Sequence, residues 1–297
     1  MALIRESRGD RIFDILMYAL VTILLIIVLY PLLYVLSCSI SDPDLVATGR
    51  VILIPRGLTL EGYRRVFQDS SIVSGYLNTI YYTVVGTVLN LAVTVPAGYS
   101  LAKNTLPGRN LFTAIFMFTM YFSGGLIPAF ILVNSLGLYN TRAVLIILGA
   151  FSTYNCIICR TFFAGLPKEL EEAAAIDGCG TIRGFFTIVL PLSKALMGVM
   201  VLYFAVAHWN SYFNALIYIM DSDKRPLQLV LRKILILETI ASEMMDEAAS
   251  EHLAEQQALA QLLKYAVIVV ASLPVLVIYP FLQKYFNKGV LIGSVKG

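Results

Sequence analysis

Residues 171–195 read EEAAAIDGCGTIRGFFTIVLPLSKA and separate two strongly apolar segments of the chain. The stretch begins with two glutamates and three alanines, reaches Asp177 and Gly178, and then becomes apolar before a Leu-Pro pair. Acidic residues suit the first turn of a helix, alanine favours helix, and glycine adopts the left-handed conformation that ends many helices. We therefore predict a short helix over residues 168–177, a glycine turn and a second short amphipathic helix at the membrane face.

The composition around this stretch is that of a membrane protein. Of the 297 residues, 58% are hydrophobic and 14% are charged, whereas soluble domains carry about 25% charged residues. The net charge of +3 is too small to indicate nucleic-acid binding, and the four cysteines form no disulfide framework. The first apolar run, residues 13–36, is much longer than the hydrophobic core of a signal peptide, so we interpret it as a retained span.

The apolar segments predict an all-α membrane protein with six transmembrane helices. A helix needs about 20 apolar residues to cross a bilayer, and the segments lack the alternation of a membrane barrel. Six spans place both termini on one side, and the short 102–111 loop, with Lys103 and Arg109, indicates that this side is the cytoplasm. The predicted spans are residues 13–36, 76–101, 112–134, 143–164, 196–220 and 265–285.

Two long loops lie on the predicted outer side. The first, residues 37–75, contains a turn at Pro55 and Gly57 and a short helix over 60–67 that Thr59 can cap. The second, residues 221–264, contains an acidic, alanine-rich helix over 242–257, which is either a solvated helix face or a docking surface. We divide the chain into an N-terminal part, 1–75, a five-helix core, 76–285, with a cytoplasmic loop at 166–195, and a cytoplasmic tail, 286–297.

Several common catalytic and ligand-binding signatures are absent from the sequence. There is no G-x-x-x-x-G-K-[ST] phosphate loop, no H-E-x-x-H and no G-x-S-x-G. Cys156 and Cys159 have a C-x-x-C spacing but lie within a predicted span, away from both histidines, so we interpret them as small buried hydrophobes. We therefore expect no metal site, no cofactor and no catalytic group in this chain.

Polar residues within spans are the candidates for a solute pathway. On a continuous helix, Asn210 and Asn214 share one face. They either hydrogen-bond between helices or form a pathway wall in which amides and aromatic rings meet a polar solute. The candidate pathway residues are Trp209, Asn210, Tyr212, Asn214, Asn78, Tyr82 and Tyr121.

The opening stretch resembles a known motif. Glu172-Ala173-Ala174, Asp177-Gly178, Phe185, Ile188 and Leu190-Pro191 match the EAA motif of the membrane subunits of bacterial ABC importers, with Cys179 where that family usually has alanine. PRGLTLEGYRRVF, WNSYFNAL and KYFNKGVLIGSVKG resemble the carbohydrate-uptake branch, in particular the LplC/YtcP type from operons for complex saccharides.

The resemblance implies a type I ABC importer (MetI-like) transmembrane domain in the bacterial cytoplasmic membrane. It implies a permease for an oligosaccharide or polysaccharide, which pairs with a second permease subunit, two ABC ATPases that bind ATP and Mg²⁺, and an extracytoplasmic solute-binding protein. It also implies a coupling helix that docks on an ATPase. The coupling residues would be Glu171, Glu172, Ala173, Ala174, Asp177, Gly178, Phe185, Leu190 and Pro191.

Two other classes of protein remain as alternatives. An ion-coupled secondary transporter needs titratable groups in its spans and often has duplicated halves. Here Asp14 is nearly alone among acids in the spans, and no duplication is visible. An intramembrane enzyme would need a Ser-His pair, paired aspartates or a metal set, none of which is recognisable.

Overall fold

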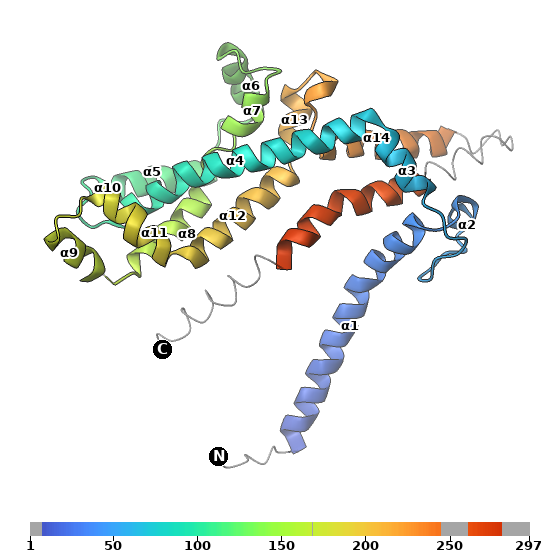
Figure 1. The fold of residues 1–297 in the computed structure, drawn as a ribbon, viewed down its shortest axis with the longest axis horizontal. Coiled ribbons are helices and arrows are strands. Elements are labelled where there is room, and N and C mark those ends of the chain that lie inside the picture. The colour runs from blue at the N-terminus through green and yellow to red at the C-terminus, as the bar shows by residue number, and fades with distance from the viewer. Residues whose placement is uncertain (1–7, 168, 245–260, 281–297) are drawn as a thin grey trace. The chain divides into compact units, whose positions relative to one another are not determined.

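The computed structural model describes residues 8–167, 169–244 and 261–280, and every regular element among these residues is helical (Figure 1). They divide into two compact units, one from residues 1–69 and 233–272 and the other from residues 70–232 and 273–297. The elements are α1 (Arg8–Ser39), α2 (Pro43–Ala47), α3 (Glu61–Gln68), α4 (Ser70–Ala102), α5 (Arg109–Tyr121), α6 (Leu126–Ser135), α7 (Arg142–Ile147), α8 (Thr153–Ala164), α9 (Glu169–Ile176), α10 (Thr181–Gly184), η1 (Phe185–Val189), α11 (Leu190–Leu192), α12 (Lys194–Trp209), α13 (Phe213–Tyr218), η2 (Ser222–Lys224), α14 (Leu227–Met244) and the helix Gln261–Pro280.

The first unit joins the long apolar helix α1 to a small polar cap. At the end of α1, the side chain of Ser37 donates to the carbonyl of Leu53 at 2.5 Å, and Cys38 is buried against Val46 and Val51. The predicted short helix after Pro55 is confirmed as α3. Thr59 assists its start, because its Oγ1 accepts a hydrogen bond from the Glu61 N–H at 3.2 Å.

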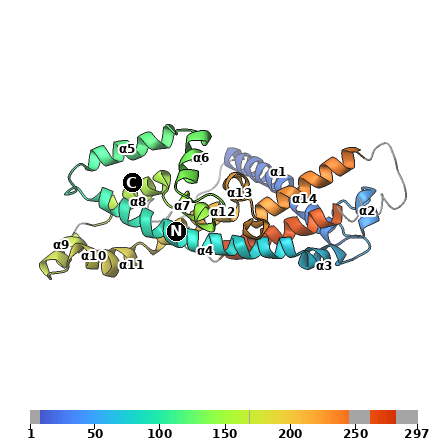
Figure 2. The same cartoon turned by 90° about the horizontal axis from the view of Figure 1, so that it is seen from above.

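The second unit is organised around α4, which packs along both α8 and α12 (Figures 1 and 2). Small and polar residues recur every three or four positions on its buried face, and such residues let helix backbones approach closely in a membrane. A Cβ added at Gly98 would lie 2.5 Å from the Cβ of Cys159. Cys156 and Cys159 are both fully buried on α8, so they act as small packing residues at this crossing.

Three of the predicted spans are broken rather than single helices. Residues 112–134 divide into α5 and α6, which differ in direction by 112° around Gly125, whose φ is +85°. Residues 143–164 divide into α7 and α8 at Gly149, and 196–220 divide into α12 and α13 after Trp209. Hydropathy alone missed these breaks because each half remains apolar.

Three described helices are long and apolar enough to cross a membrane, Gly9–Ser39, Ser70–Ala102 and Gln261–Pro280, and the number rises to five if two bent pairs are counted as spans. The second bent pair, Thr181–Leu192 with Lys194–Trp209, turns by 85°. Residues 281–285 of the last predicted span, the predicted tail 286–297 and most of the acidic helix 242–257 lie outside the described residues.

Candidate functional site

The predicted helix and glycine turn are present in the 166–195 loop, which lies at one end of α4 (Figure 1). Helix α9 has three glutamates in its first turn. It ends in a Schellman arrangement, with the N–H of Cys179 donating to the carbonyl of Ala174 at 2.8 Å and that of Gly178 to Ala175 at 3.1 Å. The φ of Gly178 is +74°, a conformation that side chains with a Cβ resist.

The predicted return segment is present and buries one apolar face, but Ile182 and Phe186 are exposed, 77% and 61% accessible, so its other face is not purely polar. It comprises α10, the π-helical turn η1 and α11. Phe185 and Val189 are buried, and the ring of Phe185 lies 4.8 Å from that of Tyr99 on α4. Leu190 is half-buried and Pro191 is exposed. The segment therefore fixes the loop to α4 through the contact between the Phe185 and Tyr99 rings.

A charged contact fixes α9 itself to α4. The Tyr99 hydroxyl donates to Oε1 of Glu171 at 3.1 Å, and the Lys103 ammonium forms an ion pair with Oε2 of the same carboxylate. Lys103 also lies over the Tyr99 ring, 4.6 Å from its centroid. Burial lowers the pKa of Lys103, and the adjacent carboxylate favours its charged form. We call Glu171, Tyr99 and Lys103 the anchor.

The loop also has an exposed surface. Glu172, Ala173, Asp177 and Gly178 are exposed, and Ala174 is half-buried. Large apolar side chains are exposed as well: Ile176 is 86% accessible and Ile182 is 77% accessible. An apolar surface beside charged residues is typical of a docking site.

A cavity of about 530 Å³ separates much of α9 from the ends of α4, α5 and α8. Lys103, Arg109, Arg160, Glu171 and Glu172 contribute the charged groups of its wall. No residue of α9 is buried, so the anchor and the Schellman turn carry much of the attachment of this helix.

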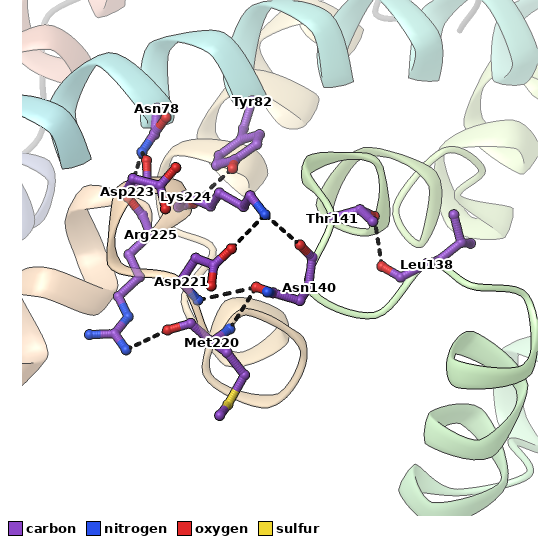
Figure 3. Close-up of polar contacts among 10 residues, drawn as sticks. All are labelled: Asn78, Tyr82, Leu138, Asn140, Thr141, Met220, Asp221, Asp223, Lys224 and Arg225. Atoms are coloured by element: carbon purple, nitrogen blue, oxygen red, sulfur yellow. Dashed lines mark hydrogen bonds and ion pairs between the residues drawn. The ribbon is translucent and has the colours of Figure 1, made fainter.

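Two of the predicted pathway residues lie toward the other end of α4 and hold a turn (Figure 3). The Asn78 amide donates to the carbonyls of Asp223 at 2.6 Å and Arg225 at 3.1 Å, and the Tyr82 hydroxyl donates to the carbonyl of Lys224 at 2.8 Å. Both side chains are buried, with 6% and 3% of their surfaces accessible. Their polar side-chain atoms therefore donate hydrogen bonds to the 220–225 turn in this structure.

Asn140, which the sequence reasoning missed, completes this arrangement from the α6–α7 turn (Figure 3). Its φ is +57°, and its Oδ1 accepts the N–H groups of Met220 at 3.0 Å and Asp221 at 3.1 Å. Lys224 donates to the carbonyl of Asn140 at 2.9 Å and to the carboxylate of Asp221 at 2.7 Å. Hydrogen bonds from Lys224 and Asn140 lower the pKa of Asp221.

We call Asn78, Tyr82, Asn140, Asp221 and Lys224 the clasp. The sequence signal that could have found it is the LGLYN stretch at residues 136–140, because glycine and asparagine both tolerate the left-handed conformation that turns between helices require.

The remaining pathway candidates do not form one surface with Asn78 and Tyr82. Trp209 is buried against Tyr76, with ring centroids 5.6 Å apart. Asn210 donates back to the carbonyl of Val206 at 3.0 Å, and the break after Trp209 removes the shared helix face that we predicted for Asn210 and Asn214. Tyr212 lies under the guanidinium of Arg232 at 5.3 Å, and Tyr121 is 73% accessible at the end of α5.

A second polar junction lies in the middle of α4. The Asn90 amide donates to the carbonyl of Gly149, at the break between α7 and α8. Its Oδ1 lies 2.7 Å from Nε2 of His208; because Oδ1 only accepts, we assign the imidazole proton to Nε2. A Cβ added at Gly86 would overlap the His208 ring. This junction ties two of the three broken spans, residues 143–164 and 196–220, to α4.

Comparison with known proteins identifies the class to which this helical domain and loop belong. Residues 72–292 match the family model described as "Binding-protein-dependent transport system inner membrane component", and the chain belongs to this family. The resemblance inferred from the EAA motif is therefore confirmed.

Relatives of known name cover nearly the whole chain. The protein LplC of Bacillus subtilis is 41% identical over 292 residues, which are 98% of this chain and 97% of LplC. The polygalacturonan/rhamnogalacturonan transport system permease YtcP of the same organism is 40% identical over 288 residues, 97% of this chain and 99% of YtcP. A chain of a bacterial ABC transporter involved in the import of the acidic polysaccharide alginate superposes with a TM-score of 0.84 at 35% identity, covering 95% of this chain and 99% of that chain.

The fold is that of a MetI-like permease, and the protein is a permease subunit of an ABC importer. These comparisons favour the importer over the ion-coupled secondary transporter. Membership of this family also makes the chain a transport subunit and implies that it works with another permease, an ATPase and a solute-binding protein.

Proposed function

We propose that this permease forms half of the pathway of an ATP-driven importer for an oligosaccharide or polysaccharide in the bacterial cytoplasmic membrane. Two relatives support a saccharide: one is named for polygalacturonan and rhamnogalacturonan transport, and one solved structure is described as an importer of alginate. The chain would cross the membrane six times with both termini in the cytoplasm, as five core helices, residues 76–285, follow the N-terminal segment.

The α9 helix is the coupling helix in this proposal and docks on one of two ABC ATPases. The observation that carries the assignment is the geometry of the loop: α9 is capped by Gly178, fixed to α4 by Glu171, and exposes the large apolar side chain of Ile176. The partner ATPases would bind ATP and Mg²⁺ and perform hydrolysis, while this chain supplies coupling and pathway and no catalytic group.

Saccharide contacts would come from polar and aromatic residues of the core helices. Tyr212, Phe213 and Asn210 are exposed at the break between α12 and α13, and aromatic faces beside amides suit the C–H faces and hydroxyls of sugars. Asn78 and Tyr82 would contribute only after releasing the carbonyls to which they donate. We therefore rank the α12–α13 break first as the pathway wall.

A pair of glycine variants tests the coupling assignment. Gly178 has a φ of +74°, whereas Gly180 has a φ of −64°, and neither has a neighbouring atom within 4 Å of an added Cβ. Gly178→Val therefore strains the turn, while Gly180→Val adds the same side chain without strain. We expect the first variant to reach the membrane but lose ATPase co-purification and uptake, and the second to retain both.

Retention of the ATPase and of uptake by Gly178→Val would contradict the coupling role of this turn. Uptake of labelled oligogalacturonides, alginate fragments and maltodextrins by the wild-type complex would test the substrate class. Transport of none of these saccharides, with transport of a non-sugar solute, would overturn the saccharide assignment.

A further inference from the structure

We propose that α4 links the two faces of the membrane mechanically through two positioning residues. Glu171 fixes one end of α4 to α9, and Asn140 fixes the 220–225 turn, which the other end of α4 holds, to the α6–α7 connection. This inference rests on the proposed function, because it assigns one end of α4 to ATPase docking. It adds a route through named residues by which a movement of α9 reaches the 220–225 turn.

The anchor and the clasp are separated by the thickness of a bilayer. At about 1.5 Å per residue, α4 rises about 37 Å between Asn78 and Lys103, and the hydrocarbon core is about 30 Å thick. The helix runs from Ser70 to Ala102 and contains Pro96, which removes one main-chain hydrogen bond. The close contact of Gly98 with Cys159 on α8 braces the helix next to this proline. A displacement of one end therefore displaces the other.

At the end near α9, the link is concentrated in few groups. The Glu171 carboxylate accepts a hydrogen bond from the Tyr99 hydroxyl and forms an ion pair with the Lys103 ammonium. Tyr99 lies in the last turn of α4, and Lys103 directly follows the helix. The cavity beside α9 reduces its other packing against α4, α5 and α8. Removal of the Glu171 charge should therefore let α9 move without α4.

At the other end, the link consists of buried side chains and main-chain groups. Asn78 and Tyr82 hold three consecutive carbonyls of the turn, and the Leu227 N–H donates to Oγ1 of Thr79 at 2.8 Å. Asn140 fastens the same turn to the α6–α7 connection through two main-chain N–H groups. These contacts make the turn, the connection and α4 one body.

Neighbouring helices pack closely against the middle and the later part of α4. The side chain of Asn90 connects Gly149 to His208, and Gly86 and Gly98 bring α4 close to His208 and to Cys159. Close packing on two sides transmits displacement rather than absorbing it. The proposed route therefore consists of the anchor, the clasp and the closely packed helix α4 between them.

Spin labels test this link without knowledge of the saccharide. Labels at Leu170, a residue of α9 outside the proposed docking surface, and at Met220, which are 43% and 63% accessible, report the distance between α9 and the turn in the complete complex, with Cys179 replaced by alanine. The complex, with its second permease, ATPases and binding protein, is measured nucleotide-free and trapped with ATP and vanadate. In the otherwise unchanged protein we expect one narrow distribution that is the same in both states.

Two variants should break the link at opposite ends. Glu171→Gln removes the ion pair, and Asn140→Gly removes the acceptor while keeping a residue that adopts positive φ freely. We expect each to broaden or shift the distribution on trapping. Glu169→Gln makes the same charge change on an exposed residue of α9, and Gly137→Asn alters the α6–α7 turn at a left-handed position with open space; both should match the parent.

A charge swap provides the rescue. Lys103→Glu combined with Glu171→Lys should restore the narrow distribution, which simple loosening of the fold would not allow. Three results would each overturn the link. They are a distance that changes on trapping in the parent, variants whose distance distributions match that of the parent, and release of the ATPase by Glu171→Gln. Failure of the parent to bind ATPase or trap nucleotide would instead contradict the proposed function.

Discussion

The two ends of α4 are built from different interactions. The clasp uses buried amide and hydroxyl donors on main-chain carbonyls, and Asn78 and Tyr82 are almost inaccessible. The anchor uses one partly exposed ion pair and one hydroxyl, beside a cavity and an exposed apolar surface. Loss of a buried hydrogen bond to a main-chain carbonyl leaves that carbonyl unpaired and destabilises the fold. A partly exposed ion pair joins two segments but contributes little to the free energy of unfolding.

The difference indicates a division of labour within one subunit. In the proposed mechanism the clasp end would resist local unfolding, and the anchor end would keep a surface available for the ATPase. A helix that joins the two carries movement without losing its own shape. Stability and coupling should therefore respond to different mutations.

The largest stability effect is expected at the clasp. Asn78→Leu removes the donors to the Asp223 and Arg225 carbonyls; a buried acceptor left unpaired costs about 1–3 kcal/mol. We expect the Tm of the detergent-solubilised complex to fall by about 4 °C or more, since about 1 kcal/mol shifts Tm by about 2–4 °C in a domain of this size. Asn210→Leu, at an exposed residue, is the control; equal Tm values would show that the clasp contributes no rigidity.

A smaller effect, from one close contact rather than two lost hydrogen bonds, is expected near the anchor end of α4. Gly98→Ala forces a Cβ against Cys159, and overpacking of this kind costs about 1–3 kcal/mol. Because the clash involves the Cβ of Cys159, Cys159→Gly should partly restore Tm whereas Cys159→Ala should not. Rescue by both second-site variants, or no loss from Gly98→Ala, would refute close packing at this crossing.

The smallest stability effect is expected at the anchor. Glu171→Gln breaks a partly exposed ion pair, which is worth about 0–1 kcal/mol, so Tm should match that of Glu169→Gln within about 2–4 °C. The Glu171 variant should nevertheless lose the fixed distance between α9 and the turn. A large fall in Tm from Glu171→Gln would erase the distinction between the two ends.

The sequence predicted local chemistry better than long-range contacts. Acids, alanines and Gly178 specify α9 and its cap within a few residues, and the structure has both. The spacing of the EAA motif correctly identified the family. In each case the information lies within one turn or one short segment.

The broken spans and the clasp depend on contacts that no local pattern contains. Leucine and isoleucine on both sides of Gly149 conceal a break that Asn90 stabilises from another helix. Asn140 binds residues about 80 positions later in the chain. The pathway candidates Asn78 and Tyr82 were chosen for their polarity, and the structure shows carbonyl partners that hydropathy and spacing do not reveal.

The central claim is that α9 is the surface that meets the ATPase, and photocrosslinking in intact membranes tests it most directly. A benzophenone amino acid replaces Ile176, on α9, or Ile54, an exposed residue of the predicted outer loop that is 76% accessible. We expect the probe at position 176 to form an adduct with the mass of permease plus ATPase, and the probe at position 54 to form none. No ATPase adduct at position 176, or an equal adduct at position 54, would contradict the account.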